Sequence, residues 1–374
     1  MKNRIVFDEK RQLLLLFAVW LCVQAALLYK YGIITTNEAV KYYREAINFL
    51  SIQKFSEQKY IFYSAYIFIR VFFINLHAET VGVYIFQLLI NLTATYLFYK
   101  TGQKIYKRTS IAFFATLLLV VCFPWQYWTV CLYTESFFCS LIIILMYCLF
   151  GTNSSYRLKY TYAFLIIMLL IFARPTGLLF LLVLLCLLLF RLIAVKKYLT
   201  AILSALAFIV AFVFLLHFEM NSAASYNFIK PFIESNIICD VPSSSQNVPA
   251  SIHGSGINAV MQYLRNNPAG FLYLCFKRFI SFWGLTRSFY SPLHNWILRL
   301  AFYPIYLFAL AGIKKQWKLN KELFLFSVSS LAVFTISVML TCDEWSNRFI
   351  MPVIPLVIFS ASYGLFTIFE KQNE

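Results

Sequence analysis

The sequence predicts an all-α, polytopic membrane protein, and its composition and apolar runs support that prediction. Hydrophobic residues make up 61% of the 374 positions and charged residues only 13%, which is outside the range of soluble globular chains. Apolar runs long enough to span a bilayer recur along the chain, about ten in all. We therefore expect residues 1–374 to form a single integral membrane domain, a bundle of transmembrane helices.

The first run, 13–29, follows basic residues as in a secretory signal. It is longer than a signal core and lacks a small-residue cleavage site, so it predicts an uncleaved anchor. Each of the later runs predicts one membrane-crossing helix. They cover residues 81–99, 110–130, 136–150, 160–173, 175–193, 199–218, 293–313, 322–341 and 349–369.

Segment 60–76 is apolar but contains Arg70, Asn75 and seven aromatic residues. If this segment crossed the membrane, every later loop would change sides, so loop charge decides its placement. When it does not cross, the short loops on the N-terminal side are all basic and contain no acid; they cover 100–109, 151–159, 191–198 and 314–321. We therefore expect an aromatic helix along the outer interface, with both termini in the cytoplasm.

Two external segments are long, 35–80 and 219–292, and we expect them to form the active-site face. Most acids of the chain fall on this outer side. The net charge of +17 then reflects the ordinary cytoplasmic bias of membrane proteins, so nucleic acid is not an expected partner. Cys239 and Cys342 both fall outside, where they could form a disulfide if their distance allows it.

Two external acids are candidates for chemistry. Glu38 opens the first external segment in TTNEAVKYYREA, where the structural alternative is a capping box with Thr35. Glu135 stands at the outer mouth of a hairpin, where the alternative is a solvated loop acid beside the helix-capping Thr134. Because acids in membrane helices are costly, they indicate function by default, and a carboxylate suits deprotonation of a hydroxyl.

Several cations also fall outside. Arg174 ends one span in ARPTG, where the alternative is a snorkelling arginine in a tight hairpin. Lys277 and Arg278 run against the positive-inside trend and so indicate an anionic partner, with membrane lipid headgroups as the simpler one.

A third group precedes the last span. Asp343, Glu344 and Arg348 lie in TCDEWSNRFIMPVIP, where a helix N-terminus beside an arginine would bind an anion. The alternative is ordinary interfacial charge around Trp345.

The order of these motifs resembles the GT-C superfamily of polyprenyl-phosphate-dependent glycosyltransferases, which includes the dolichyl-phosphate-mannose mannosyltransferases and the bacterial aminoarabinose transferases. The similarity covers most of the chain, motif by motif. The matching positions are Glu38, Tyr42 and Ala46, then Pro124 with Thr134-Glu135-Ser136, then Arg174 and Gly177 in R-P-x-G, and finally Arg348, Pro352 and Pro355.

The resemblance implies an inverting sugar transfer on the extracytoplasmic face, from a polyprenyl-phosphate-linked donor to a glycan, lipid or protein acceptor. In this reading Glu38 is the catalytic base and Glu135 a second acid. The donor phosphate would meet Arg348, Arg174, Lys277 and Arg278, and the sugar or acceptor would meet Tyr42, Asp343 and Glu344.

No cofactor is expected, and the scattered histidines show no metal-ligand spacing, without excluding a divalent ion. Two other functions remain as alternatives: a transporter or flippase of a lipid-linked glycan, and a non-catalytic membrane scaffold. Glycine is only 11 of 374 residues, which disfavours the broken helices of transporters.

Overall fold

The computed structural model describes residues 8–221, 230–241 and 256–371. It divides into two compact units. Unit 1 comprises Met1–Phe180, Leu307–Phe324 and Ile354–Glu374, and unit 2 comprises Leu181–Tyr306 and Leu325–Val353. Within the predicted external segment 219–292, residues 222–229 and 242–255 lie outside the described part.

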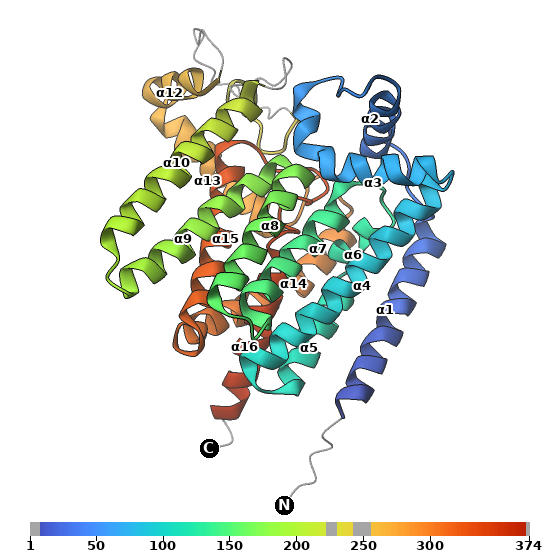
Figure 1. Cartoon of the computed structure of the whole chain (residues 1–374), viewed down its shortest axis with the longest axis vertical. Coiled ribbons are helices and arrows are strands. Elements are labelled where there is room, and N and C mark those ends of the chain that lie inside the picture. Colours follow the sequence, from blue (N-terminus) through green and yellow to red (C-terminus); the bar gives the residue numbers. More distant parts are fainter. Residues whose placement is uncertain (1–7, 222–229, 242–255, 372–374) are drawn as a thin grey trace, which may run out of the picture. The chain divides into compact units, whose positions relative to one another are not determined.

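Unit 1 combines long helices with shorter ones that lie across one of their ends (Figure 1). Its helices are α1 (Glu9–Tyr31), α2 (Glu38–Ile52), α3 (Ser64–Asn75), α4 (Glu79–Tyr106), α5 (Thr109–Val120), α6 (Phe123–Gln126), α7 (Thr134–Met146), α8 (Tyr156–Ala173) and α16 (Ile354–Lys371). Turns of 3-10 helix cover Gln58–Tyr63, Tyr127–Thr129 and Pro175–Leu178, and a π turn covers Tyr147–Gly151.

Unit 2 is also helical in its described residues. It holds α10 (Tyr198–Asn221), α11 (Lys230–Ile233), α12 (Gly256–Asn266) and α13 (Pro268–Gly284). Three further helices contribute residues to both units: α9 (Leu179–Ala194), α14 (Pro292–Leu319) and α15 (Lys321–Leu340).

Eight helical segments of the described chain are long and apolar enough to cross a membrane, and they match eight of the predicted runs. Run 110–130 is instead bent by 64° between α5 and the segment Phe123–Thr129. Pro124 stands at the start of α6, and a proline cannot continue the hydrogen-bond ladder of α5.

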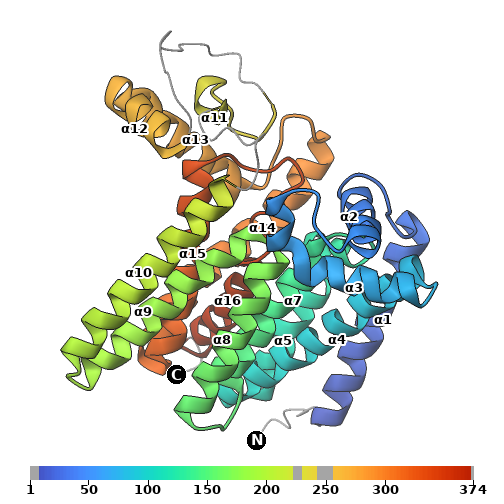
Figure 2. The ribbon, with the colours of Figure 1, turned by 45° about the horizontal axis from the view of Figure 1, so that its top comes forward.

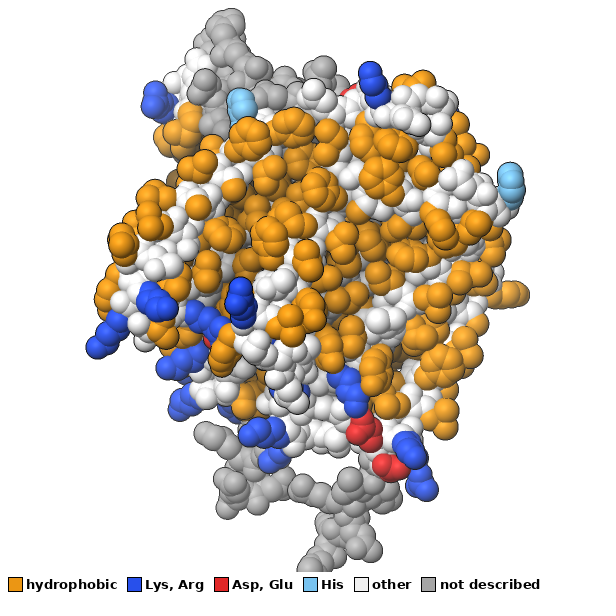
Figure 3. All heavy atoms as spheres, in the orientation of Figure 1, with side chains coloured by type: hydrophobic (Ala, Val, Ile, Leu, Met, Phe, Trp, Pro, Cys, Tyr) orange, Lys and Arg blue, Asp and Glu red, His pale blue; other side chains and the backbone are white. Residues whose placement is uncertain are grey.

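The helix in the last predicted run, 349–369, is shorter than the run itself. The apolar helix covers only Ile354–Ile368, because the residues from Arg348 to Val353 form turns. The surface over α1, α4 and α8 is widely apolar (Figure 3), with Leu14, Leu89 and Leu165 more than half exposed. The chain is therefore a multi-pass membrane protein.

The predicted interfacial helix 60–76 is found as a 3-10 turn, Gln58–Tyr63, followed by α3. At 12 residues α3 is about 18 Å long, well short of a hydrocarbon core of about 30 Å. Figures 1 and 2 show α3 crossing the end of α4, with α2 packed above it. The geometry is that of a helix lying on the bundle rather than within it.

An ion pair lies at each end of α4. At one end of α4, Lys100 pairs with Glu9 at 2.5 Å, and Lys104 binds the Thr152 carbonyl. At the other end Arg70 pairs with Glu79 at 3.2 Å. The start of α1 and the loops 100–109 and 151–159 thus gather at one end of unit 1, and the side of the membrane that this end faces stays a prediction.

Candidate active site

A backbone pairing brings the starts of α2 and α7 together. The amide of Ile34 donates to the Val130 carbonyl at 2.8 Å, and the amide of Leu132 donates to the Ile34 carbonyl at 3.0 Å. Arg70 reinforces the pairing from α3, because its guanidinium donates to the carbonyls of Ala39 at 2.7 Å and Leu132 at 3.2 Å. Two segments far apart in sequence, each with a predicted acid, therefore lie side by side.

Glu38 is the first residue of α2, and its side chain is 25% exposed. Asn37 occupies the N-cap position without a side-chain cap bond, so the capping box with Thr35 is not formed. Asn37 has a φ of 55°, a backbone region that L-residues rarely adopt, and such strain gathers at functional sites. Glu38 forms an ion pair with Lys41 at 2.8 Å on the helix surface.

Tyr42 lies one turn further along α2 and is buried between the rings of Tyr63 and Tyr66, whose centroids are 5.4 Å and 5.6 Å away. Burial raises the pKa of the Tyr42 hydroxyl well above its usual range. Tyr63, Glu135 and Glu38 add to the rise and Arg174 opposes it. Since Coulomb interactions weaken with distance, these charges lie around Tyr42.

Glu135 and Arg174 form a buried ion pair. The carboxylate oxygen lies 2.7 Å from a guanidinium nitrogen, and the side chains are 2% and 9% exposed. α7 begins at Thr134 without a side-chain cap, so a capping role does not explain Glu135. Arg174 has an extended backbone because it precedes Pro175, which ends α8 at Ala173.

Gly177 completes this hairpin. A Cβ atom there would lie 2.2 Å from the carbonyl oxygen of Leu170, so only glycine fits.

Tyr133, which the sequence analysis missed, joins the same group. Burial is the largest cause that raises the pKa of its hydroxyl, and the charges of Glu135 and Glu38 add to the rise. We call Glu38, Tyr42, Tyr133, Glu135 and Arg174 the polar cluster. Unit 1 thus brings together four of the nine predicted site residues.

The other five predicted residues lie in unit 2. Asp343 is bound to Arg287 at 2.6 Å, and both side chains are almost fully buried. Burial raises the pKa of the Asp343 carboxyl, and the guanidinium of Arg287 opposes that rise. Ser281 and the amide of Glu344 also donate to Asp343. With these partners, Asp343 is occupied in holding the loop rather than facing a sugar.

Glu344 and Arg348 form a local ion pair at 3.2 Å. The Glu344 carboxylate is 4% exposed and also accepts from the amide and hydroxyl of Ser346. The expected helix N-terminus is not at Arg348, since α16 begins at Ile354. Glu344 therefore shapes this turn, while Arg348 keeps 20% of its side chain exposed.

Lys277 and Arg278 are neighbours on α13 with opposite environments. Arg278 is fully buried, with its guanidinium bound to the carbonyls of Asn236, Met339 and Pro231, and burial lowers its pKa to about 10. These bonds argue against the predicted donor-phosphate role. Lys277 is only partly buried and lines a pocket.

That pocket, the α13–α14 pocket, has a volume of about 440 Å³. Its lining holds Lys277, Arg287 and Arg299 together with the hydroxyls of Ser281 and Ser288. Among the described residues that line it there is no carboxylate. Its chemistry suits an anion, and Arg299 is a cation that the sequence analysis missed.

A disulfide supports this region of unit 2. Cys239 and Cys342 are joined, with Cα atoms 5.2 Å apart. The amide of Cys239 donates to the Asp343 carbonyl at 2.7 Å, and the amide of Asp343 donates to the Ile237 carbonyl at 2.9 Å.

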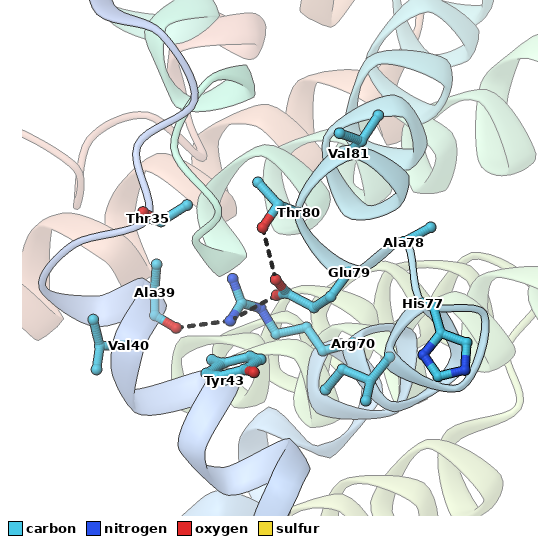
Figure 4. A pocket seen from close by; sticks show the side chains of 11 residues that line it. Thr35, Ala39, Val40, Tyr43, Arg70, His77, Ala78, Glu79, Thr80 and Val81 are labelled. Atoms are coloured by element: carbon cyan, nitrogen blue, oxygen red, sulfur yellow. Dashed lines mark hydrogen bonds and ion pairs between the residues drawn. The ribbon is translucent and has the colours of Figure 1, made fainter.

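A larger pocket, the α2–α4 pocket, has a volume of about 670 Å³ and lies in unit 1. It is lined from the start of α2, the end of α3 and the start of α4 (Figure 4). Arg70 and Glu79 form its charged part, and none of the polar cluster lines it. Arg70 was visible in the sequence as the only charge in an aromatic helix, a costly placement that indicates a specific partner.

Metal-binding groups do not gather in the described part of the chain, where no three His, Cys, Asp or Glu side chains could hold one ion.

No family model and no curated protein sequence matches this chain. Among solved structures, the chain resembles the oligosaccharyltransferase of Archaeoglobus fulgidus, which was crystallised tethered to an acceptor peptide containing the NVT sequon. The TM-score is 0.54 at 14% sequence identity, over 98% of this chain and 50% of the archaeal one.

At this identity the likeness is one of fold. The chain therefore shares the fold of that enzyme, and the predicted all-α bundle of membrane helices is confirmed. It spans half the length of the archaeal enzyme.

Proposed function

We propose that the chain is a membrane glycosyltransferase that moves a sugar from polyprenyl phosphate to an acceptor hydroxyl. The observation that supports this most is the polar cluster at one end of unit 1, where a backbone pairing joins the starts of α2 and α7 and Glu135 pairs with Arg174. The fold supports it too, because an oligosaccharyltransferase shares that fold.

Glu38 is the base in this proposal. Its carboxylate is 25% exposed, whereas Glu135 is 2% exposed and bound to Arg174. A substrate hydroxyl can reach a partly exposed carboxylate, and a general base must come within hydrogen-bond distance of the proton it takes. Glu135 and Arg174 then position the start of α7 and set the field around Tyr42.

The chemical step is a single displacement. Glu38 takes the proton from the acceptor hydroxyl, and the acceptor oxygen forms a bond to the anomeric carbon. The bond between that carbon and the phosphate oxygen breaks, and the phosphate leaves with the electron pair. One accessible carboxylate suits this inverting route, since retention would require a second carboxylate as nucleophile.

Within unit 2, the α13–α14 pocket suits a lipid-linked phosphate by its own chemistry. Arg287 is neutralised there by Asp343, while Lys277 and Arg299 supply positive charge. Exposed apolar side chains flank the pocket residues on both helices, including Phe276 on α13 and Trp296 and Leu300 on α14. A cationic pocket beside apolar surface suits a phosphate carried on a lipid chain.

The proposed active face is extracytoplasmic. The polar cluster lies at the end of unit 1 away from Lys100 and Lys104, and the basic end of a membrane protein ordinarily faces the cytoplasm. Sugar nucleotides are not ordinarily available outside, which favours a lipid phosphate as the donor.

Purified protein in nanodiscs should transfer sugar from polyprenyl-phosphate sugars to an added acceptor, and NMR of the product should show inversion at the anomeric carbon. A retained configuration would contradict the single displacement. Movement of the lipid-linked sugar across the bilayer without bond breakage would indicate a flippase instead. If the protein neither transfers nor moves the sugar with any common donor, a non-catalytic scaffold is the remaining function.

A further inference from the structure

We propose that the α2–α4 pocket binds a neutral saccharide unit of the acceptor, an inference that rests on the proposed sugar transfer and names the acceptor's chemical class. The pocket of about 670 Å³ is within the range of small-molecule sites. It is built wholly within unit 1, from the first turns of α2 and α4 and the end of α3.

The charges of this pocket balance. Arg70 and Glu79 are 3.2 Å apart, with side chains 1% and 16% exposed, and the lining holds no other Lys, Arg, Asp or Glu among the described residues. A phosphate would be attracted by Arg70 and repelled by Glu79. A neutral hydroxyl uses both, because it accepts from a guanidinium and donates to a carboxylate.

One polar atom of the pair lacks a hydrogen-bond partner. Nε of Arg70 is buried and has none within the described chain, whereas Oε1 of Glu79 faces the Arg70 guanidinium at 3.2 Å. Thr80 donates to the other carboxylate oxygen of Glu79 at 3.0 Å. Buried polar atoms are almost always hydrogen-bonded in proteins, so each exception asks for an explanation such as a ligand.

The remaining lining suits a sugar ring. Tyr43 is 43% exposed and lines the pocket together with Arg70 (Figure 4). Val40, Ile74 and Val81 add apolar surface. An aromatic face next to paired donors and acceptors matches the C–H face and the hydroxyl edge of a saccharide.

The pocket adjoins the proposed base through α2. Ala39, Val40 and Tyr43 line it, and Glu38 directly precedes Ala39 on the neighbouring face of the helix. Arg70 binds the Ala39 carbonyl at 2.7 Å. A saccharide held here would therefore lie close to the residue that activates the acceptor hydroxyl.

The test is calorimetric titration of the full chain in nanodiscs with neutral disaccharides of glucose, galactose, mannose and N-acetylglucosamine. We expect at least one to bind, with affinity about tenfold weaker in Tyr43→Ala, equivalent to about 1.4 kcal/mol. Tyr43→Phe should keep the affinity because it keeps the ring. Tyr162→Ala is the matched control, since Tyr162 is 42% exposed on α8 and should change affinity less than about twofold.

Absence of saccharide binding, or binding that Tyr43→Ala leaves unchanged, would overturn the inference. So would binding of short-chain phosphatidylethanolamine in place of the saccharides, which would make the pocket a lipid-headgroup site. Glu38→Gln separates this inference from the proposed function, because it should abolish transfer and retain saccharide binding. Saccharide binding by a chain that transfers nothing would reject the function and leave the binding site.

Discussion

The carboxylate of Glu135 and the guanidinium of Arg174 meet at 2.7 Å inside unit 1, with side chains 2% and 9% exposed. Such a pair adds little net stability, because the cost of removing two charges from water offsets most of their attraction. Both charges of the pair act on Tyr42, where Glu135 raises the pKa of the hydroxyl and Arg174 opposes the rise.

Glu135→Gln should destabilise the protein by about 3–5 kcal/mol, because it removes the carboxylate that faces a buried guanidinium. Replacing both Glu135 and Arg174 by methionine should recover most of that loss. Equilibrium unfolding in detergent measures the free energy of unfolding of both variants. The control is Glu57→Gln, which breaks the exposed pair with Lys59 at 2.8 Å and should cost about 0–1 kcal/mol. Equal costs for Glu135→Gln and Glu57→Gln would contradict the burial argument.

Lys277 and Arg278 offer a matched pair of substitutions on one helix. Arg278→Met should cost about 3 kcal/mol or more, because three backbone carbonyls lose a charged donor. Lys277→Met should leave unfolding nearly unchanged and weaken binding of polyprenyl phosphate about tenfold, since Lys277 lines the cationic pocket. Native mass spectrometry measures the lipid binding. The reverse pattern would assign the donor site to Arg278.

The disulfide between Cys239 and Cys342 provides a test of sidedness. Disulfides persist on the oxidising side of a membrane, so the bond should be present in protein from native membranes. Mass mapping without reductant detects it. Replacing both cysteines by serine should cost about 2–5 kcal/mol. Two free thiols at Cys239 and Cys342 would place this part of unit 2 on the cytoplasmic side.

Much of the fold could be predicted because hydrophobic length is a local property. Helices matching 81–99 and 175–193 follow from apolar runs alone, and Pro175 marks where α8 ends. The bend at Pro124 and the late start of α16 were missed, because proline is tolerated inside transmembrane helices and so does not by itself mark a break in an apolar run.

The polar cluster was predicted in part for a similar reason. Glu38, Glu135 and Arg174 were visible as charges out of place in apolar sequence. The contacts of such charges were not visible, because burial depends on the tertiary fold. On α13, for example, Arg278 is fully buried while its neighbour Lys277 lines a pocket. Arg299 was missed because its role depends on packing between α13 and α14.

The central claim is that Glu38 is the base of a lipid-phosphate-dependent sugar transfer. The most direct measurement is transfer from radiolabelled polyprenyl-phosphate sugars in native membranes, comparing wild type with Glu38→Gln at equal expression. Glu57→Gln, an exposed acid of the same external segment, is the control. We predict that Glu38→Gln lowers transfer by about 10²–10⁴-fold and that Glu57→Gln does not. Equal transfer by wild type and Glu38→Gln would contradict the assignment of the base.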